Sequence, residues 1–563
     1  MSSADEIKRL QDLANKLRVL SVQATDASKS GELSNLRKIT SDLEGHPTPR
    51  LNFVDVATGS LGQGLSVAAG MAYVAKYIDQ LDFRTYCVLG DGEVAEGSVW
   101  EAMNFASLKQ LNNLVAIFDV NRLGQSQETC LGHQVEVYAD RAKSFGWNPI
   151  IVDGHNISEL LAAFAKAAEC KDKPTAIIAK TFKGKGFPNI EDKLNWHGKA
   201  LGAKSNEVLA HLNAQLSSED VNSSYNESKA EAPAVNLKEV KLSSPPDYKL
   251  GEKIATRFAY GTALVKLGQT CNRVISLDAE TKNSTYAETY MKQFPDRFVE
   301  CYIAEQNLVG VGIGLGCRGR TIPFLSTFAA FFMRAADHLR MAEISQANIK
   351  CVGSHCGVSI GEDGPSQMAL EDLALFRSIP NCTVFYPSDA VSTERACELA
   401  AQHHGIDFIR TSRPATSVIY TSDTKFEIGK AQVVRQSKKD KLLFIGAGVT
   451  LHECLTAADI IEKKHQIFTR VIDPFTIKPL DSQTIIENAI AVGGRVLVVE
   501  DHYPEGGLGD AVAKALLANG NGYPFRFLHL AVNEVPRSGQ PAELMSKYRI
   551  DAETIEKEIE KFM

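Results

Sequence analysis

Short runs of β-branched and other apolar residues alternate with longer amphipathic segments along almost the whole chain. Apolar runs of this length, bounded by glycine, asparagine or aspartate, are typical of buried strands, and the segments between them have the spacing of helices. The alternation predicts an α/β fold with mainly parallel sheets. In the first third, strands are expected at Arg84–Leu89, Leu114–Val120, Ile150–Val152 and Thr175–Lys180, and a long helix at Leu65–Tyr77.

The pattern breaks twice. Residues 215–248 are rich in serine, asparagine, glutamate, lysine and proline, which is typical of a surface linker, and a weaker break falls around Tyr420–Ile428. We therefore expect a first domain over 1–214, a second over 249–420 and a third over 429–563. The second domain is expected to contain strands at Arg273–Leu277, Arg297–Tyr302, Thr321–Ser326, Ile349–Gly353, Thr383–Tyr386 and Asp407–Arg410. The third is expected to contain strands at Lys441–Ile445, Phe468–Ile472, Arg495–Val499 and Phe525–Leu530.

Composition narrows the class of protein. The 563 residues are 44% hydrophobic and 23% charged, as in ordinary globular proteins, and too many for one hydrophobic core. A net charge of -7 provides no basic field for nucleic acid or anionic lipid, and no apolar run is long enough to span a membrane. Eleven scattered cysteines without a Cys-x-x-Cys pair favour the reducing cytosol over a disulfide framework.

The first chemical signal is Gly90-Asp-Gly-Glu, followed at the end of the next strand by Asn121-Arg-Leu-Gly-Gln. Parallel neighbouring strands would place Asp91 and Asn121 at the same edge of the sheet, where α/β proteins bind ligands. Hard oxygen ligands suit Mg²⁺ or Ca²⁺ bridging a diphosphate, and Gly92 lets backbone amides approach phosphate oxygens. We expect a metal–diphosphate site here, against the alternative of a glycine turn with an asparagine cap.

Further motifs extend this signal beyond the first domain. They are Ala57-Thr-Gly-Ser-Leu-Gly-Gln-Gly, Ala179-Lys-Thr-Phe-Lys-Gly-Lys-Gly, Trp196-His-Gly-Lys, Ile303-Ala-Glu-Gln-Asn, Ser326-Thr-Phe-Ala-Ala-Phe-Phe, Gly353-Ser-His-Cys-Gly-Val-Ser-Ile-Gly-Glu-Asp-Gly-Pro-Ser-Gln, Phe408-Ile-Arg-Thr-Ser-Arg-Pro, Asp473-Pro-Phe-Thr-Ile-Lys-Pro and Glu500-Asp-His-Tyr-Pro-Glu-Gly-Gly. With these motifs the chain closely resembles transketolase, from about Leu33 to the C-terminus. The resemblance implies thiamin diphosphate, a divalent cation and a homodimer that transfers a two-carbon ketol unit between sugar phosphates of the pentose phosphate pathway.

The resemblance also implies a role for each matching residue. Asp91, Asn121 and the carbonyl of Leu123 would bind the metal. The thiamin diphosphate would be lined by Gly59, Ser60, Leu61, Gly92, Asn121, Gln125, Lys183 and His197, with Phe331 stacked on its aminopyrimidine and Gln367 nearby. Glu305 of a partner subunit would hydrogen-bond that ring, against the alternative of a solvated glutamate at a strand end. Catalytic roles would fall to Glu305, His355, His197 and His46.

Substrate contacts follow from the same resemblance. They would be made by His46, His197, Arg257, Ser284, His355, Asp363 and Arg413. The two arginines make chemical sense for the phosphate end of a sugar phosphate, because a guanidinium binds phosphate through two parallel hydrogen bonds. Taken one at a time, each histidine would more often be a structural hydrogen-bonding group and each arginine a surface charge.

The chain departs from the family after Gln23-Ala-Thr-Asp-Ala-Ser-Lys-Ser-Gly31. There a transketolase continues with His-Pro and a segment that ends in Ser-Lys-Gly-His, whereas Gly31 runs straight into Glu32-Leu-Ser-Asn-Leu. The missing part exceeds a βαβ unit and would include two active-site histidines and a lysine. Three interpretations stay open: a natural form with a shortened first domain, an incorrectly spliced gene model, and a junction that rearranges and keeps a reduced activity.

The shortened domain leaves three functions to compare. The first is transketolase activity itself. The second is another thiamin-dependent reaction, of a deoxyxylulose-phosphate synthase or a 2-oxo-acid dehydrogenase, which Arg413 and the Gly353-Ser-His run disfavour. The third is a catalytically weak or inactive partner that dimerises with a full-length transketolase and regulates it. Loss of a buried unit is also expected to leave an unpaired strand edge and exposed apolar side chains in the first domain.

Overall fold

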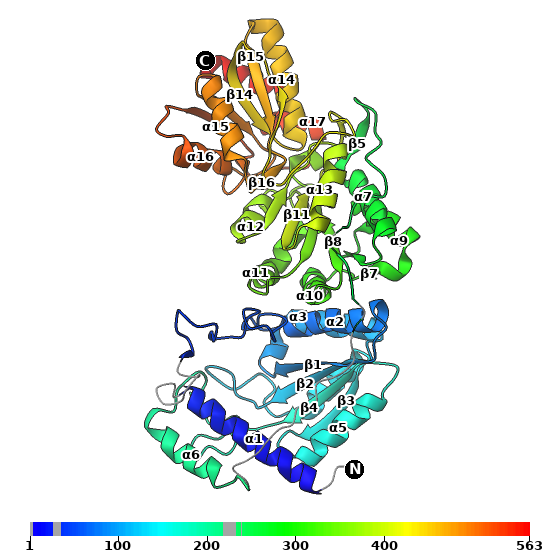
Figure 1. Cartoon of the computed structure of the whole chain (residues 1–563), viewed down its shortest axis with the longest axis vertical. Helices are drawn as coiled ribbons and strands as arrows, with labels where there is room; N and C mark the ends of the chain where they lie inside the picture. Colours follow the sequence, from blue (N-terminus) through cyan, green and yellow to red (C-terminus); the bar gives the residue numbers. More distant parts are fainter. Residues whose placement is uncertain (1–3, 26–34, 218–231, 233, 238) are drawn as a thin grey trace. The chain divides into compact units, whose positions relative to one another are not determined.

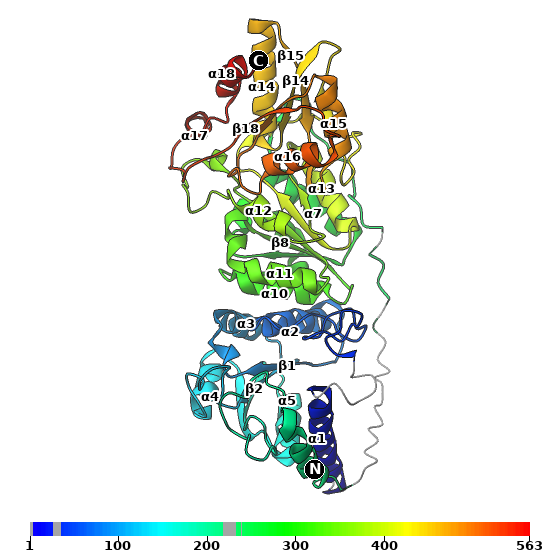
Figure 2. The ribbon, with the colours of Figure 1, turned by 90° about the vertical axis from the view of Figure 1, so that its left-hand side faces the viewer.

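The computed structural model describes residues 4–25, 35–217, 232, 234–237 and 239–563, and it divides into two compact units, Met1–Ala234 and Val235–Met563. Figure 1 shows the whole chain and Figure 2 the same ribbon turned by 90°. The junction at Gly31–Glu32 lies outside the described residues, and so do residues 218–231, 233 and 238 of the expected linker. The division does not test the domain boundaries expected at 214, 248, 420 and 429, which stay predictions.

Unit 1 contains a four-stranded parallel sheet in the order β1-β2-β4-β3. The strands are β1 (Thr85–Gly90), β2 (Leu114–Val120), β4 (Thr175–Lys180) and β3 (Asn148–Asp153). Strands are present at all four sites expected in this region, and the bounds of β2 and β4 are the expected ones. Because the strands are parallel, their carboxyl ends meet at one edge of the sheet.

Helices cover both faces of the sheet of unit 1 (Figure 2). On one face α2 (Gly64–Tyr73), which continues as a π-helical turn to Ile78, packs on β1 beside α3 (Gly97–Leu108). On the other face α5 (Ile157–Glu169) buries Ala163 and Ala167 against Val115, Val152, Ile177 and Ala179. The N-terminal helix α1 (Ala4–Thr25) packs on α6 (Ser205–Asn213), as the amphipathic pattern of each helix favours.

Strand β1 is one of the two edge strands of this sheet among the described residues. On the face that α5 covers, the β1 side chains of Tyr86 and Val88 are 51% and 67% exposed, although Tyr86 touches Phe164 of α5 edge-on at 5.8 Å. Their β2 neighbours in register, Val115 and Ile117, are buried and half-buried. An edge strand with exposed apolar side chains is what the sequence led us to expect of a shortened first domain.

The first part of unit 2 is built on a seven-stranded sheet in the order β16-β10-β11-β9-β8-β6-β7, parallel except for β16 (Figure 1). The strands are β6 (Val274–Asp278), β7 (Phe298–Glu300), β8 (Ile322–Phe328), β9 (Ile349–Ser354), β10 (Thr383–Phe385), β11 (Ile406–Arg410) and β16 (Thr476–Lys478). The helices α7 (Thr256–Thr270) and α13 (Ala390–Gln402) pack together over one face and bury a large apolar core.

The second part of unit 2 contains a five-stranded sheet in the order β13-β15-β14-β17-β18, in which only β13 is antiparallel. The strands are β13 (Gln432–Arg435), β14 (Asp440–Gly446), β15 (Phe468–Asp473), β17 (Arg495–Val499) and β18 (Arg526–Leu530). The helix α14 (Val449–His465) packs on this sheet and on α18 (Ala552–Phe562) (Figure 2). Strands are present at all the expected sites of unit 2, but the sequence analysis missed β5 (Lys253–Ala255), β12 (Ala415–Ser417), β13 and β16.

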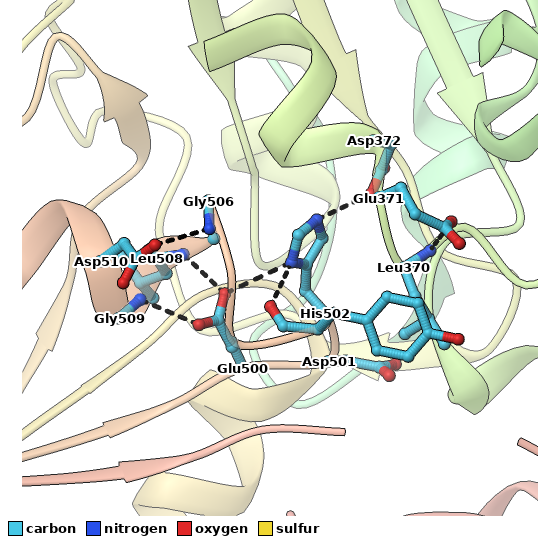
Figure 3. Close-up of polar contacts among 12 residues, drawn as sticks. Leu370, Glu371, Asp372, Glu500, Asp501, His502, Gly506, Leu508, Gly509 and Asp510 are labelled. Carbon is cyan, nitrogen blue, oxygen red and sulfur yellow. Dashed lines mark hydrogen bonds and ion pairs between the residues drawn. The ribbon is translucent and has the colours of Figure 1, made fainter. Parts of the chain in front are cut away.

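A buried polar cluster joins the two parts of unit 2, and Figure 3 shows its side around His502, whose Nε2 lies 3.8 Å from the Asp372 carboxylate. The carboxylate of Asp372 forms two hydrogen bonds with the guanidinium of Arg410, at 2.7 and 2.9 Å, and Arg410 also donates to the Asp501 carbonyl at 3.0 Å. The Asp501 carboxylate accepts the backbone N–H groups of Val358 and Ser359 at 2.7 and 3.2 Å. The third-domain motif that begins at Glu500 therefore holds the backbone of the glycine-rich run that begins at Gly353.

Two further findings bear on the class of protein. No helix of the described part of the chain is long and apolar enough to cross a membrane. All eleven cysteines fall in the described residues, and all are free thiols. Most of them are buried, whereas Cys130 is exposed.

Candidate active site

The ends of β1 and β2 bring Asp91 to the loop that follows Asn121, as the strand order requires. One carboxylate oxygen of Asp91 accepts the Arg122 N–H at 2.7 Å and the Thr129 hydroxyl at 2.9 Å, and the other accepts the Gly92 N–H at 2.9 Å. Burial raises the pKa of the Asp91 carboxyl, and the nearby Asp119 adds to this effect. A buried carboxylate beside a second acid is an environment that a bound cation would stabilise.

The neighbouring loop presents further oxygen atoms. The side-chain oxygen of Asn121 accepts the Leu123 N–H at 3.1 Å, which fixes the amide at this edge of the sheet. The carbonyl of Leu123 accepts a hydrogen bond from the Lys183 ammonium at 3.3 Å, and that ammonium lies 3.0 Å from Nδ1 of His197. The structure thus brings together five of the residues expected in unit 1.

A cavity of about 690 Å³ opens beside these residues, at the carboxyl ends of the strands. Its polar lining combines Asn121 and Lys183 with Arg18, Asp119, His155, Thr181 and Lys185, and Val88 and Ile117 form part of its apolar wall. The Thr181 hydroxyl donates to the Asp119 carboxylate, and Nε2 of His155 accepts the Phe182 N–H at 2.8 Å. The cavity has the size and the mixed lining of a small-molecule site.

The loop around Gly59 also belongs to unit 1, but none of its described residues lines the cavity of unit 1. Gly59 has a φ of 119°, and a Cβ placed there would lie 2.9 Å from the ring of His46, so His46 packs directly on this glycine. Leu61 is 61% exposed and Gln125 is exposed, and neither lines the cavity of unit 1 among the residues described. The roles expected for His46, Ser60, Leu61 and Gln125 stay predictions.

Unit 2 contains a second cavity, of about 570 Å³. Its lining includes every substrate residue that the sequence analysis expected in this unit, together with Gln367: Arg257, Ser284, His355, Asp363, Gln367 and Arg413. These residues come from four separate segments between α7 and the loop after β11, since His355, Asp363 and Gln367 share the run that begins at Gly353. The fold therefore assembles one polar cavity from residues that are far apart in sequence.

The two arginines of this cavity differ in their surroundings. Arg257 donates one hydrogen bond to the Ser284 carbonyl at 2.9 Å, and its buried Nε has no hydrogen-bond partner among the described residues. Burial lowers the pKa of Arg257, and the charge of Arg413 lowers it further. Arg413 donates to the Ile360 carbonyl at 2.6 Å and to the Asp363 carboxylate at 3.2 Å. A buried guanidinium with an unpaired N–H is a ready donor for an anionic ligand.

His355 lies between these cations and an aromatic stack. Its ring is parallel to Phe328 at 3.8 Å, and Phe328 in turn stacks on Phe331 at 5.2 Å. Burial, assisted by the charges of Arg257 and Arg413, lowers the pKa of His355 to about 3. The imidazole is therefore neutral near pH 7, so it can both donate and accept a hydrogen bond.

Glu305 differs from the alternative of a solvated strand-end residue. Strand β7 ends at Glu300, and Glu305 is the first residue of the helix α10 (Glu305–Gly316), where its side chain is 9% exposed. A carboxylate at a helix N-terminus is stabilised by the helix dipole and by backbone N–H groups. Its expected contact with the cofactor stays a prediction.

Sequence reasoning missed several residues that line the two cavities. They are Asn283, Tyr286 and Phe328 in unit 2, and Arg18, Asp119 and His155 in unit 1. Asn283 and Phe328 lie next to or inside segments that already carried a signal, since Asn283 precedes Ser284 and Phe328 is in the Ser326-Thr-Phe-Ala-Ala-Phe-Phe motif. Arg18 comes from the N-terminal helix, and no motif pointed to it.

Comparison with known proteins agrees with this geometry. Three family models match the chain: "Transketolase, thiamine diphosphate binding domain" over residues 27–230, "Transketolase, pyrimidine binding domain" over 252–418 and "Transketolase, C-terminal domain" over 429–555. Human transketolase is 57% identical over 525 residues, which cover 93% of this chain and 83% of the relative. The chain belongs to the transketolase family. Human transketolase-like protein 2, another member of the family, is 56% identical over 535 residues, covering 95% of this chain and 84% of the relative.

A solved structure of the transketolase family has the same fold. The transketolase of Campylobacter jejuni superposes with a TM-score of 0.80 over 94% of this chain and 86% of that chain, at 22% identity. Family membership makes the chain a transferase with a first domain of the thiamin diphosphate-binding type. The relatives include both transketolases and transketolase-like proteins, so membership alone does not separate the two functions.

Proposed function

We propose that the chain is a transketolase that uses thiamin diphosphate and a divalent cation, Mg²⁺ or Ca²⁺. It transfers a two-carbon ketol unit from a ketose phosphate, of the xylulose 5-phosphate type, to an aldose phosphate, as a step of the pentose phosphate pathway. The observation that carries the proposal is the cavity of unit 2, where two arginines, a neutral histidine and a serine lie together. We further propose that the enzyme acts as a homodimer in the cytosol.

The residues of unit 1 fit the cofactor and its metal. A carboxylate, an amide oxygen and a main-chain carbonyl are the oxygen donors that Mg²⁺ and Ca²⁺ prefer, and Asp91, Asn121 and Leu123 provide them from adjoining loops. The Leu123 carbonyl now accepts a hydrogen bond from the Lys183 ammonium, which would turn to the diphosphate when a metal binds this oxygen. Lys183 and His197 would face the diphosphate, and Gly92 would leave room for its oxygens.

Bound thiamin diphosphate supplies the electron sink that allows cleavage of the carbon–carbon bond next to the ketose carbonyl. The protein residues bind, orient and exchange protons. Arg257 and Arg413 would hold the phosphate end of the sugar, and Ser284 would add a hydroxyl donor. His355, being neutral, would exchange hydrogen bonds with sugar hydroxyls, and Asp363 would accept one. Glu305 would hydrogen-bond the aminopyrimidine of the cofactor.

A coupled assay of the purified chain on xylulose 5-phosphate and ribose 5-phosphate tests the proposal. We expect turnover that depends on thiamin diphosphate and Mg²⁺, and a higher thermal midpoint when both are added, because a ligand of the native state stabilises it. Glu305→Gln should abolish turnover and leave the cofactor-induced shift intact. A chain that shows no shift at millimolar cofactor would contradict the cofactor assignment, and pyruvate consumption without ketose cleavage would favour another thiamin-dependent reaction.

A second function is supported by the exposed edge of unit 1. The side chains of Tyr86 and Val88 are exposed on β1, whereas unit 2 has a complete polar cavity. A first domain with an uncovered face beside an intact second unit suits a catalytically weak or inactive protein that dimerises with a full-length transketolase and regulates it. Co-purification with such a paralogue, together with no turnover by the homodimer, would favour this function over the first.

A further inference from the structure

A buried carboxylate lies beneath the loop that forms one wall of the unit 2 cavity. Asp278 is the last residue of β6 and its side chain is completely buried. One carboxylate oxygen accepts the N–H of Thr281 at 2.5 Å and its hydroxyl at 3.2 Å, and the other accepts the Thr285 hydroxyl at 2.8 Å. Three donors from residues 279–286, which we name the Asp278 loop, therefore converge on one side chain.

The Asp278 loop has a conformation that needs such support. Glu280 and Tyr286 have φ values of 61° and 66°, in the left-handed region that residues with a Cβ rarely adopt. Each such residue costs free energy, so the surrounding contacts must hold the loop in this shape. The carboxylate of Asp278 supplies contacts to both halves of the loop, through Thr281 and Thr285.

The same loop orients the buried arginine of the cavity. Asn283, Ser284 and Tyr286 line the cavity, and the Ser284 carbonyl accepts the hydrogen bond of Arg257 at 2.9 Å. The ring of Tyr286 lies against the guanidinium of Arg257, with 5.4 Å between the guanidinium carbon and the ring centre. A shift of the loop would therefore move the carbonyl and the ring that fix the direction of this guanidinium.

We propose that Asp278 is a positioning residue that sets the affinity of the unit 2 cavity for phosphate esters, by holding the loop that orients Arg257. Asp278 does not touch the cavity, and it acts through Thr281, Thr285 and Ser284. This inference rests on the proposed function, because it takes the phosphate end of a sugar phosphate as the ligand of the cavity.

The electrostatics of Asp278 provide a signature that a purely structural contact would not show. Burial raises the pKa of Asp278 to about 7, and the charge of Glu300 on β7 contributes. The other ionisable groups that interact with it are Lys282, which is paired with Glu300 at 2.7 Å, and the buried Tyr260 of α7. As the pH falls through about 7, the carboxylate takes up a proton and its charge-assisted hydrogen bonds to the loop weaken.

Isothermal titration with ribose 5-phosphate, without a ketose donor, measures this affinity directly. At pH 8 we expect Asp278→Asn to bind about 3- to 10-fold more weakly than the unchanged chain, because the charge-assisted hydrogen bonds are lost. The ratio of the two affinities should approach one at pH 6, where the carboxyl of the unchanged chain is protonated. Titration of the phosphate ester itself affects both proteins equally and cancels in the ratio.

Matched variants separate positioning from folding. Thr285→Val removes one donor to Asp278 and should weaken binding, whereas Thr285→Ser keeps the hydroxyl and should restore it. Asp473→Asn is the control for the isosteric change, since Asp473 is also completely buried, with a pKa raised by burial to about 6, and it binds Tyr420 and the Phe475 N–H. It should bind ribose 5-phosphate like the unchanged chain. The thermal midpoint of each variant without ligand reports folding separately.

The outcomes distinguish this inference from the proposed function. Equal affinities of Asp278→Asn and the unchanged chain at pH 8, with the same pH profile, would overturn the positioning role alone. Equal affinities of Thr285→Val and Thr285→Ser would also overturn it. Failure of the unchanged chain to bind ribose 5-phosphate would overturn the proposed ligand of the cavity, and this inference with it.

Discussion

The two guanidinium groups of the unit 2 cavity are held in different ways, and this difference shapes what each can do. Arg257 is fixed by the Ser284 carbonyl and by the Tyr286 ring, and its Nε lacks a partner among the described residues. Arg413 is 34% exposed and already paired with the Asp363 carboxylate. An anion that enters the cavity would complete the hydrogen bonds of the first and compete with a carboxylate for the second.

Arg413→Lys should weaken the binding of ribose 5-phosphate by about 10-fold or more, because an ammonium cannot form the two parallel hydrogen bonds of a guanidinium. Isothermal titration of the purified variant measures the change. Arg435→Lys is the matched control, since Arg435 pairs with Asp459 and Glu462 in the C-terminal part, away from the cavity. A variant of Arg413 that binds as tightly as this control would show that Arg413 does not hold the phosphate.

At the scale of single residues, the sequence predicted which residues line the unit 2 cavity, but not the contacts that orient them or set their charge. Arg257, Ser284, His355, Asp363 and Arg413 were expected at one site because of the resemblance to transketolase, and they do line one cavity. The neutral state of His355 depends on its burial and on two nearby charges, which come from segments distant in sequence. Contacts of that kind exist only after the chain has folded.

The glycine-rich run between β9 and α12 (Asp372–Ser378) owes its shape to a contact with the C-terminal part of the unit. Gly357 has a φ of 73°, and a Cβ at this position would collide with the carboxylate of Asp501. That carboxylate binds the N–H groups of the next two residues, so the backbone must approach it closely. In the sequence, His355 precedes the residues of this contact and Asp363 follows them.

Gly357→Ala should therefore lower the free energy of unfolding by about 2–4 kcal/mol, the cost of overpacking together with a left-handed alanine. Chemical denaturation followed by circular dichroism measures the loss. Gly251→Ala is the control, because Gly251 also has a positive φ, of 81°, but its Cβ would meet nothing within 4 Å. Equal losses for the two variants would show that the contact with Asp501 is unimportant.

The exposed edge of β1 leads to a prediction about solubility. Val88→Thr should leave stability within about 0.5 kcal/mol, since Val88 is 67% exposed, and should reduce aggregation at an unpaired strand edge. Light scattering during heating measures the second effect. Val115→Thr on the neighbouring strand is the matched control, because Val115 is fully buried and the change should cost about 1–3 kcal/mol. Unchanged aggregation of Val88→Thr would indicate that this edge is covered in solution.

The elements were predictable in proportion to their length. Strands such as β2, β4 and β17 carry continuous apolar runs, and their bounds were those expected from the sequence. The strands β5, β12 and β16 have three residues each, and they exist because a distant segment pairs with them, as β12 does with β5 and β16 with β10. No local pattern of three residues distinguishes such a strand from a loop.

The proposed cofactor and substrate have most of their expected contacts in different units, which gives a prediction for the chain as a whole. Thiamin diphosphate with Mg²⁺ should slow amide hydrogen exchange around Asp91, Asn121 and Lys183 in unit 1, because their backbone loops would bind the diphosphate and the metal. Ribose 5-phosphate should instead slow exchange around Ser284 and Arg413 in unit 2. Exchange measured by mass spectrometry with each ligand alone separates the two effects.

Protection that is confined to unit 1 with ribose 5-phosphate, or to the C-terminal part with thiamin diphosphate, would contradict this assignment of ligands. At this scale the sequence predicted the α/β class and the family, because long alternating patterns and many motifs carry them. It did not predict that the second and third expected domains form one compact unit, since their contacts join segments such as those around Val358 and Asp501.

The pairing of β16 with β10 also sets an order for events during synthesis on the ribosome. Residues Thr476–Lys478 complete one edge of the sheet whose other strands are finished at Arg410, so that sheet emerges with the outer edge of β10 unpaired until part of the next domain is made. If synthesis stalls after Arg410 and before Thr476, the unpaired strand edge is exposed to other nascent chains on the same messenger RNA. We therefore expect the yield of folded protein to depend on how long the outer edge of β10 stays uncovered during synthesis.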